Sequence, residues 1–218
     1  MNGVPPIDWE GALETFRSIR APQNVPQDQI PNHQEFWPTI CALILEGKLD
    51  EAWQILSLHS DLAEVITSDR RSDSERDILE AIYDVMTTHP FINVVNTLST
   101  NSIDCEHVEI SSTISAEFKD WQDKVSSILQ SSSSLLGRVS ELNTMLQLLV
   151  GDKETLIAHS KGEWTTLSTG LFLYVYPPPL IRADISKIIE SAMNMMIPRK
   201  DISEADRIRC VLTLAKFK

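Results

Sequence analysis

The strongest constraint on the fold is the stretch from Phe36 to Leu56, in which one glycine separates two runs of helical periodicity. Apolar side chains recur three or four positions apart in both runs, so each run forms a helix with one apolar face. Gly47 stands where the chain must reverse, in a position that often takes the left-handed conformation, which glycine enters without a Cβ penalty. Asp50 and Glu51 fall in the first turn of the second helix, where the helix dipole favours negative charge. The apolar positions are Trp37, Ile40, Cys41 and Ile44 in the first run and Leu49, Ala52, Trp53 and Leu56 in the second.

A helical hairpin of this kind cannot bury both outer surfaces by itself, so further helices must stack on it. The rest of the chain supplies them, since its apolar periods are near 3.6 and no period-two alternation predicts a strand. We therefore predict an all-α fold of stacked antiparallel helical hairpins, similar to an α-solenoid, with about nine or ten helices. Outside the hairpin, the predicted helices are Ile7–Arg20, Ser74–Thr88, a helix that begins at Ser112 or Thr113 and ends at residues 131–134, Leu135–Val150, a helix after Asp152, Trp164–Tyr176, Ile181–Met196 and Ser203–Phe217.

The glycine joint of the hairpin recurs later in the chain. Gly151 follows the apolar run that ends at Val150, and there it can reverse the chain. Asp152 directly after it can cap the next helix. The same turn is therefore expected at two places.

Prolines divide the N-terminal part of the chain. Residues 1–31 are interpreted as one helix followed by a proline-rich linker, and residues 32–218 as the helical stack. The helix that contains Pro38 is expected to start near Glu35, because proline is tolerated only close to the beginning of a helix. Residues 91–111 show no sustained period and receive no assignment.

The composition excludes several classes of protein. The chain of 218 residues is 42% hydrophobic, which is enough for one sizeable core. Its 31 acidic and 19 basic residues give a net charge of −12, so we expect no direct binding of nucleic acid. No apolar run approaches the ~20 residues of a membrane-spanning helix, and residues 1–20 lack the pattern of a secretory signal. The cysteines, Cys41, Cys105 and Cys210, are odd in number and far apart, which fits a reducing compartment.

The sequence contains no pattern typical of catalysis, of a cofactor or of a metal site. No two histidines have the i, i+4 spacing of a helical metal site, and Cys105 with His107 makes a poor chelate without further ligands. Phosphate-binding glycine loops and a G-x-S-x-G elbow are also absent. We therefore predict no catalytic, cofactor-binding or metal-binding residues, and we expect solvent-facing histidines. The histidines are His33, His59, His89, His107 and His159.

Two further groups of residues allow a functional and a structural interpretation. The densest charged run could dock a partner, but mixed-sign runs are more often solvated helix ends. Four tryptophans could be interface anchors, but each lies on an apolar helical face, which favours core packing. The charged run comprises Asp69, Arg70, Arg71, Asp73, Glu75, Arg76 and Asp77, and the tryptophans are Trp37, Trp53, Trp121 and Trp164.

Four stretches resemble, in the same order, the family of the eighty-five-kilodalton nucleoporin, a subunit of the Y-shaped outer scaffold of the nuclear pore. They are FWPTICALILEGKLDEAWQIL at 36–56, EFKDWQDKV at 117–125, LQLLVGDKETL at 146–156 and WTTLSTGLFLYVYPPP at 164–179. The resemblance implies a fold-back helical stack of the ancestral coatomer element type, akin to vesicle-coat subunits. It also implies a structural role at the nuclear pore complex in the nuclear envelope, in support of mRNA export and protein transport. The implied partners are other subunits of the Y-shaped complex, and no catalytic residue or cofactor is implied.

The chain departs from that family's pattern in two ways. Family members are much longer, so the chain is similar to the front part of their helical domain and the expected stack is incomplete. Family members also carry strands that insert as an extra blade into a β-propeller partner, whereas Met1–Pro31 has scattered prolines and no alternating β-branched run. We therefore do not expect tight binding of the propeller. We also expect an exposed apolar patch near the end of the chain, formed by Val211, Leu212, Leu214 and Phe217.

Two other functions remain open at this point. A free-standing helical-repeat adaptor would bind protein partners in a groove, which requires clustered polar and basic side chains along one concave face, and the sequence shows no such cluster. An all-α enzyme would need its chemistry in dispersed residues, and no feature of the sequence calls for one.

Overall fold

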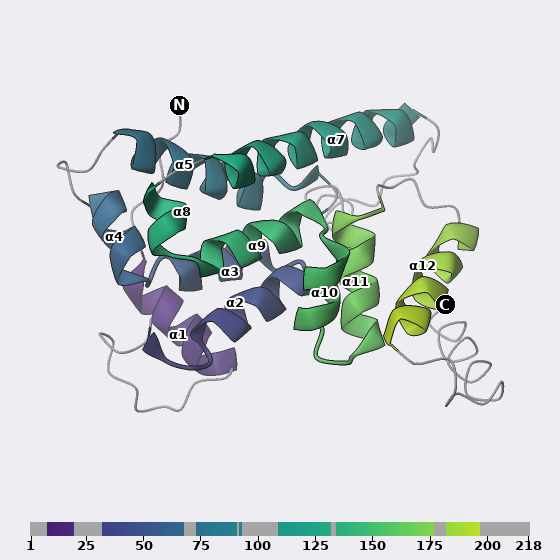
Figure 1. Ribbon diagram of the computed structural model, residues 1–218, viewed down its shortest axis with the longest axis horizontal. Coiled ribbons are helices and arrows are strands. Elements are labelled where there is room, and N and C mark those ends of the chain that lie inside the picture. The colour runs from purple at the N-terminus through teal and green to yellow at the C-terminus, as the bar shows by residue number, and fades with distance from the viewer. Residues whose placement is uncertain are drawn as a thin grey trace.

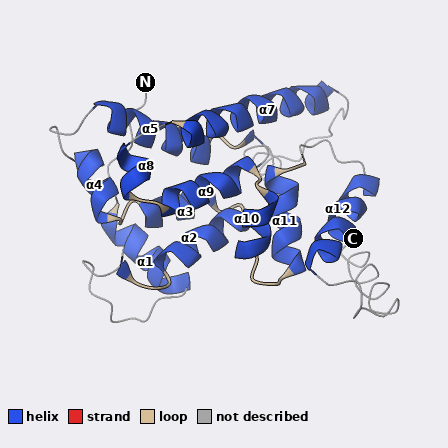
Figure 2. Cartoon of the chain, in the orientation of Figure 1, coloured by secondary structure: helices blue, strands red, loops and turns tan. Residues whose placement is uncertain are grey.

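The structure, a computed structural model, is all-helical in the part of the chain that it describes. It describes residues 8–19, 32–67, 73–90, 92, 109–131, 134–176 and 182–196. Within these ranges there are eleven helices and no strand (Figures 1 and 2), which confirms the predicted fold class. None of the described helices is long and apolar enough to cross a membrane. The helices are α1 Trp9–Ile19, α2 Phe36–Leu45, α3 Leu49–Leu56, α4 Ser60–Thr67, α5 Asp73–Thr87, α7 Glu109–Gln130, α8 Ser134–Arg138, α9 Glu141–Val150, α10 Lys153–His159, α11 Trp164–Tyr174 and α12 Arg182–Met196.

The α2–α3 hairpin turns at Gly47, as its sequence predicts. Gly47 has a φ of 76°, in the left-handed region. The Gly47 N–H donates to the carbonyl of Ile44 at 2.9 Å, and the Lys48 N–H donates to that of Leu43 at 2.9 Å. These two bonds satisfy carbonyls that the end of α2 would otherwise leave unpaired. At its other end, α2 begins at Phe36, so Pro38 lies in the first turn, where its missing N–H costs nothing.

The second joint repeats this geometry at Gly151, between α9 and α10. Gly151 has a φ of 82°, and its N–H donates to Leu148 while that of Asp152 donates to Gln147. The Asp152 carboxylate accepts from the N–H of Thr155 at 2.9 Å and so caps α10. Both predicted roles are confirmed, and the turn builds a second hairpin from α9 and α10.

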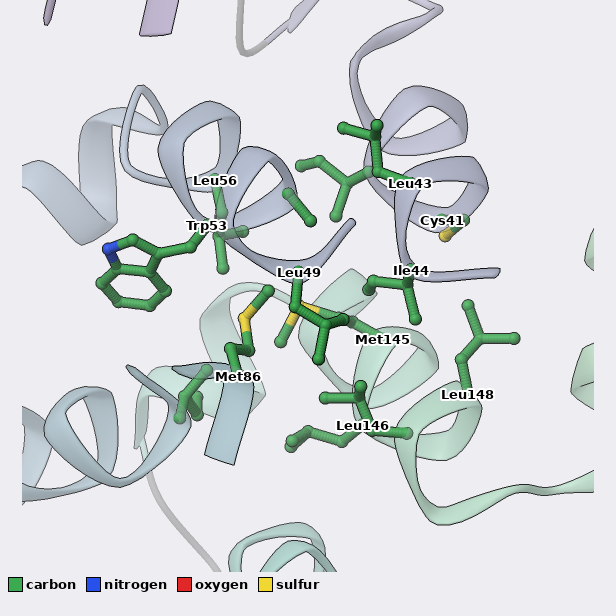
Figure 3. Packing of buried hydrophobic residues seen from close by; sticks show 14 of the residues in the cluster. Cys41, Leu43, Ile44, Leu49, Trp53, Leu56, Met86, Met145, Leu146 and Leu148 are labelled. Carbon is green, nitrogen blue, oxygen red and sulfur yellow. The ribbon is translucent and has the colours of Figure 1, made fainter. Parts of the chain in front are cut away.

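The two hairpins pack against each other and form the centre of the molecule. α2 contacts α9 and α10, α5 and α7 cover α3 and α9, and α1 packs on α3. Figure 3 shows side chains of α2 and α3 facing those of α9. α4 and α8 lie at one end of the assembly, and α11 and α12 lie at the other (Figure 1). Buried residues of this core include Leu43, Ile44, Leu49, Trp53, Leu56, Met86, Met145, Leu146 and Leu148.

The structure corrects the prediction of one helix over Leu135–Val150. The stretch forms two helices, α8 and α9, which are separated at Val139 and Ser140. Asn143 of α9 donates its side-chain amide to the carbonyl of Leu136 at 3.3 Å, so a side chain replaces part of the helical backbone ladder. With this break, both leucines of α8, Val139 and every apolar residue of α9 except Val150 are buried.

Two other helices differ from the prediction. α4 was not predicted, because its eight residues place only Leu62, Ala63 and Val65 in the core, too few for a clear period. α7 begins at Glu109 rather than at Ser112 or Thr113, and it ends at Gln130, directly before the serines, as predicted. The linker before residue 32, the helix Ser203–Phe217 with its apolar patch, and Cys105, His107 and Cys210 lie outside the described residues.

Candidate functional site

The described residues contain no site prepared for metal binding or thiol chemistry. No group of three or more His, Cys, Asp or Glu side chains among them could hold a metal ion. Cys41 is a free cysteine buried in the core, and burial raises the pKa of its thiol to about 11. A thiol with so high a pKa is protonated at neutral pH and is therefore a poor nucleophile.

His89 is buried, which corrects the expectation of solvent-facing histidines. Its side chain is 1% exposed and lies against the rings of Phe118, Trp121 and Tyr174. Nδ1 accepts from the N–H of Ile92 at 3.3 Å, so the proton is on Nε2, which donates to the carbonyl of Leu173 at 3.2 Å. Burial lowers the pKa of His89 to about 4. The His89 ring is therefore neutral, and its hydrogen bonds connect the end of α5 with the end of α11.

Other polar side chains join His89 at the C-terminal end of α11. Tyr174 is 0% exposed, and its hydroxyl donates to the carbonyl of Ile44 at 2.5 Å. Burial raises the pKa of that phenol far above its usual value. Gln122 donates to the carbonyl of Tyr174 at 2.8 Å, and the Trp121 indole N–H donates to that of Val85 at 2.7 Å. We call His89, Trp121, Gln122 and Tyr174 the α11 junction, because their hydrogen bonds tie α11 and α7 to α2 and α5.

Both glycine turns abut the α11 junction. A Cβ at Gly151 would lie 2.4 Å from the carbonyl oxygen of Tyr174, and one at Gly47 would lie 2.9 Å from Cδ1 of Leu173. Gly170 within α11 passes equally close to a side chain of α2, since its Cβ would lie 2.9 Å from Cδ2 of Leu45. Only residues without a side chain allow this close approach. The repeated turn of the sequence is therefore the place where α11 docks.

Glu75 corrects the interpretation of the charged run as solvated helix ends. It is 6% exposed, and its Oε1 pairs with Nη2 of Arg138 at 3.1 Å. The Ser134 hydroxyl donates to the same oxygen. Glu75 therefore ties α5 to α8, which is a structural role that its neighbours in the sequence do not indicate. Residues 69–72 of the run lie outside the described residues.

The tryptophans divide into two groups. Trp53 and Trp121 are buried in the core, as predicted. Trp37 and Trp164 are only half-buried. Trp37 lies on α2 beside the rings of Phe36 and His59, and it lines a depression in the surface.

That depression belongs to a groove along the α9–α10 hairpin. A depression of about 260 Å³ beside the first turn of α2 shares Thr144, Ala158 and His159 with one of about 610 Å³ toward Gly151. We call the two together the α9–α10 groove. Its apolar lining is Trp37, Pro38, Cys41, Leu129, Val150 and Ala158, its neutral polar lining is Thr144, Gln147, Thr155 and His159, and its charged lining is Glu141, Asp152, Glu154 and Lys161. The sequence did not reveal this groove, because its lining residues come from three separate stretches of the chain, at 37–41, 129 and 141–161.

Comparisons with known proteins agree on one family. The family model described as Nup85 nucleoporin matches residues 9–216. Nuclear pore complex protein Nup85 of Danio rerio is 21% identical over 196 residues, which cover 88% of this chain and 26% of that protein. The protein of the same name from Rattus norvegicus is 22% identical over 172 residues, 78% of this chain and 23% of its own length. The one from Homo sapiens is 24% identical over 147 residues, 66% of this chain and 19% of its own length. The chain thus spans about a quarter or less of the relatives that it matches.

Proposed function

Because the chain belongs to the Nup85 nucleoporin family, we propose that it acts as a structural component of the nuclear pore complex. The observation that carries this proposal is the family match, which extends over residues 9–216 and leaves few residues unmatched. In this role the chain supports nucleocytoplasmic transport, including mRNA export and protein import, by holding other subunits in place. Its location is the nuclear pore in the nuclear envelope.

The chemistry of the buried side chains supports a scaffold rather than an enzyme. Cys41 and Tyr174 keep their protons because burial raises their pKa values, and His89 stays neutral because burial lowers its pKa. A general base or an activated nucleophile needs a pKa near the working pH, whereas burial moves the pKa values of these three groups away from it. The α11 junction uses these groups to connect helices, which suits a protein whose task is to keep its shape.

The proposed partners are other subunits of the Y-shaped outer scaffold. A stack of helices offers long faces for such contacts, since each helix pair covers only its neighbours. A β-propeller partner is not included for residues 1–218, because residues 1–31 lack the alternating pattern of an inserted strand. Mixing the purified chain with the purified propeller in size-exclusion chromatography tests that exclusion, and stable co-elution would contradict it.

Localisation in intact cells tests the proposed function. A fluorescently tagged chain should give a continuous rim at the nuclear envelope, whereas a free-standing adaptor should give diffuse staining. Two matched glycine variants extend the test. Gly137→Ala adds a methyl group that meets nothing within 4 Å, whereas the methyl group of Gly151→Ala would lie too close to the Tyr174 carbonyl. Rim staining should survive the first change and be lost with the second. Diffuse staining of a folded, tagged chain would overturn the proposal.

A further inference from the structure

The α9–α10 groove is a feature of the described surface to which the packing of the helices assigns no role. Its floor follows the α9–α10 hairpin, and its apolar end is closed by the first turn of α2. α9 has ten residues, so the groove is about 15 Å long at 1.5 Å per residue. That length matches two to three turns of a helix, or four to five residues of an extended segment.

The hydrogen-bonding groups of the groove are mainly acceptors. The carboxylates of Glu141, Asp152 and Glu154 can only accept, and all three side chains are exposed. Nδ1 of His159 lies 3.0 Å from the carbonyl oxygen of Thr155 and is therefore already engaged within α10. A complementary segment must therefore bring donors.

The charges of the groove also favour a partner that brings basic groups. Asp152 and Glu154 line the larger depression, whose lining includes no lysine or arginine, and Glu141 and Lys161 line the smaller one. The whole chain carries a net charge of −12, so its long-range field also attracts a cationic segment. Trp37 is half-buried at the apolar end, and a tryptophan in that state is a typical anchor of an interface.

We propose that the α9–α10 groove docks a basic amphipathic segment of a partner protein. Arginine or lysine side chains of the segment face Glu141 and the Asp152–Glu154 end, and one apolar side chain of the segment packs against Trp37 and Ala158. This mode is the laying of an amphipathic helix into a groove. That the partner is a pore subunit rests on the proposed function. The preference of the groove for a basic segment does not, so a binding experiment tests that preference independently of the localisation experiment.

The test is fluorescence anisotropy with the purified full chain and two labelled peptides. Each probe has twelve residues, with leucine at helical spacing on one face and with either arginine or glutamate on the other face. The arginine peptide should bind at least about tenfold more tightly than the glutamate peptide, and added salt should weaken its binding.

Two variants and a control assign that binding to the groove. Glu141→Lys with Glu154→Lys should weaken the arginine peptide by at least about tenfold. Glu117→Lys with Asp120→Lys changes the net charge equally at exposed positions of α7 outside the groove and should change affinity by less than about threefold. Ala158→Trp fills the groove at an exposed position of α10 and should also abolish binding. Equal losses in both charge variants, unchanged binding by Ala158→Trp, or no binding by the parent chain would overturn the proposal, whatever the tagged chain does in cells.

Discussion

At the scale of single residues, the glycines differ in what a side chain would meet. Gly151 and Gly162 have nearly the same φ, 82° and 80°, but the Cβ of Gly151 would meet a backbone oxygen and that of Gly162 would meet no atom within 4 Å. We expect Gly162→Ala to cost about 1 kcal/mol through left-handed strain alone. Gly151→Ala should cost roughly 3 kcal/mol, because the carbonyl of Tyr174 cannot move away cheaply. Urea unfolding of the two variants measures this difference, and equal losses would show that the close approach at Gly151 is unimportant.

Gly47→Ala should fall between these two variants. Its φ of 76° imposes the same strain, but the atom that it meets is Cδ1 of Leu173, the end of a side chain that can change its rotamer. We expect a loss of about 1–2 kcal/mol in the free energy of unfolding. A loss as large as that of Gly151→Ala would mean that Leu173 is held rigidly by its neighbours.

The buried His89 predicts a dependence of stability on pH. Its pKa is about 4 in the folded chain and about 6.5 in the unfolded chain, so below pH 6.5 the unfolded chain binds more protons. The stabilisation is therefore complete above pH 6.5 and is lost as the pH falls toward 4, by up to about 3 kcal/mol.

Urea unfolding at several pH values between 7 and 4.5 measures this loss. The variant His89→Gln should be less stable at pH 7 and should show a flatter slope against pH, because the titrating group is gone. His59→Gln is the control, since burial lowers the pKa of His59 as well but its ring is only half-buried. A slope that His89→Gln leaves unchanged would contradict the proposed neutral state.

At the scale of helices, the ion pair between α5 and α8 matters because its carboxylate, that of Glu75, is buried while the Arg138 side chain is 32% exposed. The Glu75 side chain is 8% exposed, and Arg138→Ala would leave its carboxylate with the Ser134 hydroxyl as its remaining side-chain partner. We expect that variant to lose about 2 kcal/mol in the free energy of unfolding. Lys124→Ala removes an exposed pair with Asp84, whose atoms are 3.5 Å apart, and should lose less than about 1 kcal/mol. Thermal or urea unfolding compares them, and similar losses would show that Glu75 remains hydrated.

At the scale of the whole molecule, the α11 junction should make unfolding cooperative. Its hydrogen bonds join helices that are far apart in the sequence, such as Tyr174 to Ile44 and His89 to Leu173. We expect the urea transition followed by tryptophan fluorescence to coincide with that followed by far-ultraviolet circular dichroism. The tryptophans lie at several places, with Trp53 in α3 and Trp121 in α7, so separate units would give separate midpoints. Two resolved transitions would contradict this prediction.

The sequence by itself determined the features that depend on neighbours along the chain. The period of apolar residues defined most helices, and Gly47 and Gly151 marked both hairpin turns, because helix ends and left-handed turns are decided within a few residues. Asp152 was identified as a cap for the same reason. The ordered series of motifs also indicated the family.

Only the tertiary structure decided what depends on distant partners. His89 looked like a surface residue, but its acceptor is the carbonyl of Leu173, 84 positions away. Glu75 looked like part of a solvated run, but it is buried and pairs with Ser134 and Arg138 of another helix. The break between α8 and α9 and the α9–α10 groove arise in the same way. Periodicity describes one helix face at a time, whereas burial, pairing and grooves are set by which faces meet.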